Sequence, residues 1–143
     1  MQGFTLTELL VTLAITLAIG SIVVTPYQNV LKTADASHAA FVYTDALREA
    51  QGRALQMEHD TAWGLAIVGN TTVVFSGASY AARVTSRDKV YALPSSITVT
   101  GGTSTIFAKF TGVPSAVSTT TFSNTFASSS VFITSGGSIV FAL

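Results

Sequence analysis

The chain has 143 residues, of which 48% are hydrophobic and only 10% are charged, and its formal net charge at pH 7 is zero. This length suits one domain. The balanced charge provides no strong field that would attract nucleic acid or anionic lipid. The chain contains no cysteine, which excludes disulfides, thiolate catalysis and Cys-based zinc sites.

The first predicted element is an apolar helix over residues 4–24, whose one charged residue is Glu8. At roughly 1.5 Å per residue this helix is long enough to cross a hydrocarbon core. A secretory signal peptide would need a positive start and a small-residue cleavage site, and neither is present. Because a carboxylate inside a membrane helix usually has a partner, and the first cation is Lys32, we expect that partner to come from another chain.

The run G-F-T-L-T-E-L-L-V, starting at Gly3, resembles the processing site of type IV pilins and pseudopilins. This resemblance implies that a prepilin peptidase cleaves between Gly3 and Phe4 and N-methylates Phe4. It also implies that Glu8 pairs with the N-terminal amine of an adjacent subunit during assembly. The leader, residues 1–3, departs from the family pattern because it has no Lys or Arg.

A second departure concerns Pro26, which lies one residue further from the cleavage point than the family's helix proline. Proline removes a helix N–H and clashes with the carbonyl four residues earlier, here that of Ile22. We therefore expect a kink or local melting of the helix at Pro26, with Gly20 assisting.

The next segment, residues 26–60, has the spacing of an amphipathic helix. Small or apolar residues recur at alternating intervals of four and three, which places them on one helix face. The stripe consists of Ala36, Ala40, Tyr43, Leu47, Ala50, Ala54 and Met57. It is rich in alanine and suits a closely packed sheet. The helix is expected to end near residues 58–60.

From Thr61 onward the pattern changes to short β-rich runs. Two hairpins are predicted, one around Gly69-Asn70 and one around Gly136-Gly137, with further strands within residues 95–102 and 103–112. Residues 78–94 and 115–130 are expected to be irregular, the second holding at most one edge strand. The sum is about five or six strands. A long helix packed on an antiparallel sheet gives the α+β class.

This order of elements also resembles the ladle-shaped pilin as a whole. The implied parts are a leader (1–3), a transmembrane and filament-core helix (4–25), an amphipathic helix (26–60) and a β-rich globular domain (61–143). The runs L-R-E-A-Q-G-R-A and W-G-L-A-I, with the second hairpin, are similar to the H-type pseudopilin and FimT-like minor pilins.

The resemblance implies a structural subunit, of the minor class, in a type IV pilus or a type II secretion pseudopilus. Its implied partners are other pilin or pseudopilin subunits, the prepilin peptidase, an inner-membrane assembly platform and membrane lipid. The protein would cross the bacterial inner membrane once, with its C-terminal domain outside the cytoplasm, before entering a surface pilus or periplasmic pseudopilus. A major pilin, or a DNA-binding minor pilin of a DNA-uptake pilus, is the alternative.

Residues that could carry chemistry are few. No G-x-S-x-G, P-loop or dinucleotide-binding run is present, so we expect no enzyme, no cofactor and no metal site. The run R-V-T-S-R-D-K holds Arg83, Arg87 and Lys89. If that segment is extended, these three cations share one face and could contact DNA phosphates. The competing interpretation is a solvated loop in which Asp88 offsets part of the charge.

Overall fold

The computed structural model describes the backbone of residues 5–142 and the side chains of residues 5–21 and 30–142. The predicted cleavage site, Gly3 and Phe4, and the side chain of Pro26 lie outside these described residues. The elements are α1 (Leu6–Leu55), η1 (Glu58–Asp60), β1 (Trp63–Val68), β2 (Thr71–Ser76), η2 (Thr85–Arg87), β3 (Lys89–Ala92), β4 (Thr98–Gly101), β5 (Ser104–Phe107), β6 (Ser118–Ser123), β7 (Ser128–Ile133) and β8 (Ile139–Ala142). The predicted α+β class with antiparallel pairing is confirmed.

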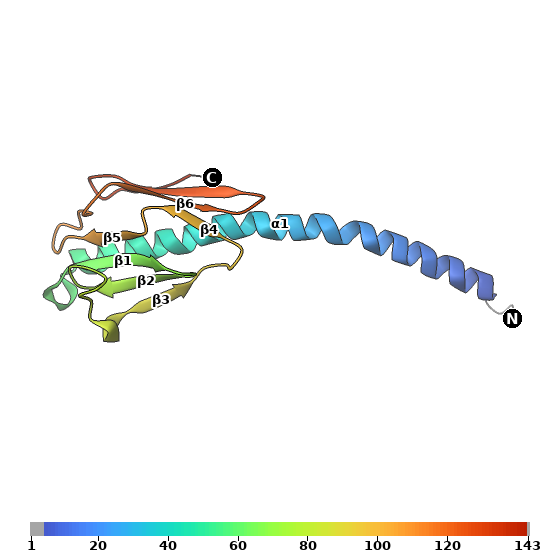
Figure 1. Ribbon diagram of the computed structural model, residues 1–143, viewed down its shortest axis with the longest axis horizontal. Helices are drawn as coiled ribbons and strands as arrows, with labels where there is room; N and C mark the ends of the chain where they lie inside the picture. The colour runs from blue at the N-terminus through green and yellow to red at the C-terminus, as the bar shows by residue number, and fades with distance from the viewer. Residues whose placement is uncertain (1–4, 143) are drawn as a thin grey trace.

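Helix α1 is continuous over its 50 residues, and its backbone stays helical through Gly20 and Pro26. The expected local melting is therefore wrong. The helix curves gently without a break, and its first half projects beyond the strands (Figure 1). A proline removes a single donor, and the bonds of the neighbouring turns are enough to keep the helix intact. Among the described residues, no helical stretch combines the length and apolarity of a membrane span.

The helix ends at Leu55, earlier than the sequence predicts. Three of the next residues, Met57, His59 and Asp60, have positive φ angles of 52°, 58° and 55°, which α-helix geometry does not allow. The backbone N–H of Phe110 donates to the carbonyl of Ala54 at 3.0 Å. The same carbonyl also accepts from the Met57 N–H at 3.2 Å, so this carbonyl in the last turn of the helix is satisfied.

The predicted alanine-rich stripe of α1 is the centre of the core. Six of its seven members, Ala36 through Ala54, are fully buried, whereas Met57 is 45% exposed because it lies beyond the helix end. The helix packs against both sheets, with one sheet on either side in Figure 1. The Tyr43 and Phe122 rings lie 5.1 Å apart, and the Tyr43 hydroxyl is 3.2 Å from Oγ1 of Thr120. Small alanine side chains permit this close approach.

The strands form two four-stranded antiparallel sheets, not one. The first sheet has the order β3-β2-β1-β5, and the second has the order β4-β6-β7-β8. Both predicted hairpins are confirmed: Val68 pairs with Thr71 across the first turn, and Ile133 with Ile139 across the second. The described chain changes sheets three times, between β3 and β4, between β4 and β5, and between β5 and β6. At the end of β4, Gly101 has φ +101°, and an added Cβ there would lie 2.1 Å from the Thr119 carbonyl oxygen.

Two strands lie in stretches predicted to be irregular. Strand β3 pairs with β2, and β6 pairs on both sides, with β4 and with β7. The expectation of an edge strand within residues 115–130 is therefore wrong, because β6 is internal. Threonine is a good strand former, and burial alternates along β6, with Thr120 and Phe122 buried. The low-complexity composition of this stretch led us to expect irregular structure where a regular strand forms.

Candidate assembly site at the tip of the long helix

The first part of α1 presents apolar side chains to its surroundings. Among the residues whose side chains are described, contacts of α1 with the globular domain include those at Lys32 and Asp35, where Asn124 Nδ2 donates to the Lys32 carbonyl at 2.6 Å and Ser96 Oγ donates to the Asp35 carboxylate at 2.6 Å. We call residues 6–21 the apolar arm. Its large side chains are 52–75% exposed: Leu6, Leu9, Leu10, Val11, Leu13, Ile15, Leu17 and Ile19. Contiguous apolar surface of this kind marks a site of association with protein or membrane.

Glu8 lies in the first turn of the apolar arm, where it forms a capping box with Thr5. The Glu8 carboxylate accepts from the Thr5 backbone N–H at 2.9 Å and from the Thr5 hydroxyl at 2.8 Å, while the Glu8 N–H donates to Thr5 Oγ1 at 3.3 Å. Reciprocal bonds of this kind fix the start of a helix. The carboxylate is therefore held at the extreme end of α1.

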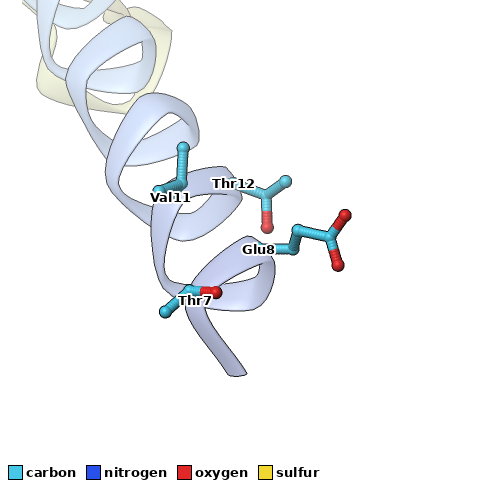
Figure 2. A pocket seen from close by; sticks show the side chains of 4 residues that line it. All are labelled: Thr7, Glu8, Val11 and Thr12. Atoms are coloured by element: carbon cyan, nitrogen blue, oxygen red, sulfur yellow. The ribbon is translucent and has the colours of Figure 1, made fainter. Parts of the chain in front are cut away.

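The surroundings of Glu8 are exposed and mostly uncharged. An open hollow beside it is lined by Thr7, Val11 and Thr12, and Figure 2 shows the Glu8 side chain extending away from the helix. Among the described residues, none forms an ion pair with Glu8. Lys32, the nearest cation in the sequence, lies roughly 36 Å further along the helix at 1.5 Å per residue. Among the described residues, no cation therefore lies within ion-pair distance of Glu8.

A second polar cluster, which the sequence did not suggest, lies where α1 meets β3. The Glu49 carboxylate accepts from Arg53 Nη2 at 2.7 Å, from Lys89 Nζ at 3.0 Å and from the Tyr91 hydroxyl. Partial burial, the largest influence, would raise the pKa of Glu49, but these three hydrogen bonds together outweigh it and lower that pKa. The cluster ties the edge of the first sheet to the helix.

The three cations considered for DNA contact each have a polar partner within the chain. A turn of 3-10 helix, η2, interrupts the segment that was expected to be extended. Arg83 Nε donates to Asp88 at 2.7 Å, Lys89 is held by Glu49, and the half-buried Arg87 reaches Ser76 Oγ at 3.4 Å. These side chains are directed to partners within the chain, and Asp88 offsets charge as the loop interpretation proposed.

The structure places Glu8 at the exposed start of α1, and its role in assembly stays a prediction. Gly20 lies on the continuous helix, where an added Cβ would meet no atom within 4 Å. Glu49 stands inside the L-R-E-A run, but its partners Lys89 and Tyr91 are about 40 positions away, so only the fold could reveal the cluster. Comparisons with protein-family models, characterised proteins and solved structures found no match to this chain.

Proposed function

We propose that this protein is a structural subunit, of the minor class, of a type IV pilus or a type II secretion pseudopilus. The observation that carries the proposal is the single carboxylate, Glu8, on an otherwise apolar helical arm. Its described hydrogen bonds are all to Thr5, which is neutral. A neighbouring subunit's amine is the counter-charge that this arrangement lacks.

The proposed mechanism is assembly. Membrane lipid holds the monomer by its apolar helix, with the globular domain outside the cytoplasm, and the prepilin peptidase then cuts between Gly3 and Phe4. An assembly platform moves the subunit into the filament, where the exposed side chains of the apolar arm exchange lipid for the arms of neighbouring subunits. Glu8 then receives the Phe4 amine of an adjacent subunit, and this pairing sets the register between them.

The other functions considered earlier have less support. The DNA-uptake alternative needs cations that are free to contact phosphates, whereas Arg83 and Lys89 are engaged by Asp88 and Glu49. A third possibility is a monomeric anchored surface domain that never polymerises, and in such a protein the carboxylate on the apolar arm would have no role. A major pilin would share every feature of the apolar arm, so the minor class is proposed on the similarity of the L-R-E-A-Q-G-R-A run to minor subunits.

The proposal is tested by replacing the residue before the predicted cut. Gly3→Leu is expected to stay in the membrane fraction with its first three residues attached and to be lost from sheared filaments, because the peptidase site requires the glycine. Gly52→Ala is the matched control, since it changes a glycine on the same helix, outside the apolar arm, without steric conflict, and it should assemble normally. Entry of Gly3→Leu into filaments would contradict the proposal.

A further inference from the structure

Strand β8 is the free edge of the second sheet, and it is made of apolar residues. The order β4-β6-β7-β8 gives β8 a hydrogen-bonded neighbour on one side only within the described chain. Its sequence is Ile-Val-Phe-Ala, and no Asp, Glu, Lys or Arg occurs anywhere from Phe110 to Leu143. Natural proteins usually protect an edge with charge, proline or a bulge. An apolar edge strand without charge, proline or a bulge can pair with a further strand.

The free side of β8 has backbone groups available for pairing. Thr134 and Ser138 bond to each other beside the turn, through the Thr134 N–H to the Ser138 carbonyl at 3.0 Å and the Ser138 N–H to Thr134 Oγ1 at 3.0 Å. Paired residues in an antiparallel ladder alternate between bonded and non-bonded positions. This alternation turns the N–H and C=O groups of Ile139 and Phe141 outward, away from β7.

The second sheet does not fully cover the face of α1 that lies beside β8. The Phe41 ring of α1 stacks on the Phe141 ring at 4.7 Å and 25°, yet Phe41 remains 54% exposed. Val140, on the opposite face of the strand, is 50% exposed. A further strand beside β8 would place an apolar side chain over the uncovered part of Phe41.

The other three edges of the two sheets are less suitable. Strand β5 is already bordered, because Phe107 bridges to Pro114 and the Ser115 N–H donates to the Ile106 carbonyl at 2.7 Å. Strand β3 carries the charged Lys89, and β4 ends in Gly101 with its left-handed backbone. Only β8 combines an open side, a regular backbone and no charge.

We propose that β8 pairs antiparallel with β8 of a second copy of this chain, with Val140 opposite Val140. A two-fold contact brings each surface against itself, and like charges opposite each other destabilise a sheet, so an uncharged strand is the one that can pair in this way. In this register the outward backbone N–H and C=O groups of Ile139 form hydrogen bonds with those of Phe141 in the second copy. Each Ile139 then packs beside the other copy's Phe141 and over its Phe41.

This contact is separate from the assembly function proposed above. The two-fold symmetry directs the apolar arms of the two copies in opposite directions, whereas subunits within one filament point the same way. The β8 pair therefore joins chains of different filaments, because chains held in one membrane also have their arms pointing the same way. It does not depend on cleavage after Gly3 or on Glu8.

The test uses single cysteines, because the natural chain has none. In the full chain in detergent micelles, Val140→Cys should be recovered mostly as a disulfide-linked dimer, since opposed non-bonded positions have Cβ atoms about 4.5–5.5 Å apart. Thr119→Cys is the first control: Thr119 is exposed in the same cross-strand row as Val140, two strands inward. Ala142→Cys is the second, because two copies of Ala142 would lie roughly 14 Å apart along the strand. Both controls should pair through β8 as the natural chain does, but they should not be recovered as disulfide-linked dimers.

Two results would overturn the β8 proposal. One is a Val140→Cys protein that cross-links no more than Thr119→Cys, and the other is cross-linking at Ala142→Cys in its place. A variant that adds a charge tests the pairing independently, because it measures the dimer fraction without a disulfide. Val140→Lys should convert dimers of the full chain to monomers in light scattering, while Thr119→Lys should leave the dimer fraction unchanged, and equal behaviour of the two would also reject the pairing.

Discussion

Replacement of Glu8 by alanine is expected to abolish incorporation of the chain into filaments while leaving it folded and membrane-bound. The variant removes the one carboxylate of the apolar arm, so the amine of an adjacent subunit would enter an apolar bundle without a counter-charge. A buried charge without a partner is strongly unfavourable. The measurement is the amount of chain in sheared filaments relative to membranes, compared with the natural sequence.

Two further variants separate charge from helix capping at this position. Glu8→Gln keeps an oxygen that can accept the Thr5 N–H but has no charge, and it too is expected to be lost from filaments. Asp45→Ala removes an exposed carboxylate from the same helix outside the apolar arm, where it lies 3.8 Å from Arg48, and it should assemble normally. Assembly of Glu8→Ala at the natural level would show that the carboxylate has no role in packing.

Replacement of Trp63 by alanine is expected to lower the free energy of unfolding by about 3–5 kcal/mol. Trp63 is fully buried between β2 and β5, its Nε1 donates to the Glu58 carbonyl at 3.0 Å, and the Arg53 guanidinium lies 4.7 Å from its ring. The substitution leaves a cavity and removes the partner of that carbonyl just beyond the end of α1. Urea unfolding of the full chain in micelles measures the loss.

The signal for this experiment has to be circular dichroism, because Trp63 is the only tryptophan and its fluorescence disappears with the substitution. Trp63→Phe is the matched control. It keeps most of the buried ring and loses the hydrogen bond, so a loss of roughly 1–2 kcal/mol is expected. Equal stability of Trp63→Ala and the natural chain would mean that this side chain is not part of the core.

The periodic parts of the sequence predicted the fold well. The alternating three and four spacing located the buried face of α1 from Ala36 to Ala54, because a stripe on one helix face reflects the burial that holds it. The two hairpins followed from glycine-containing turns between apolar runs. These signals are local, and each depends on residues close together in the chain.

The parts that failed depend on tertiary contacts. Strand β6 reads as a low-complexity threonine and serine run, and only its pairing with β4 and β7 makes it a central strand. The end of α1 is determined in part by Phe110, which is distant in sequence. The split into two sheets follows from which strands pair with one another, and these pairings join residues far apart in the sequence.

The same division applies to the sites. Glu8 could be predicted because an acid in an apolar run is conspicuous by itself. The Glu49 cluster could not, since the hydrogen bonds from Lys89 and Tyr91 form only when β3 lies against α1. Arg83 and Lys89 looked available for a ligand in the sequence, and the fold provides both with carboxylate partners.

The mass of the N-terminal peptide, measured on protein recovered from its native cell, tests the proposed assembly role most directly. The account predicts a chain that begins at Phe4 with one added methyl group on its amine, which leaves Glu8 near a free amine of the next subunit. A chain that keeps Met1, or one trimmed beyond Pro26, would contradict it, because Glu8 would then be without that amine or absent altogether.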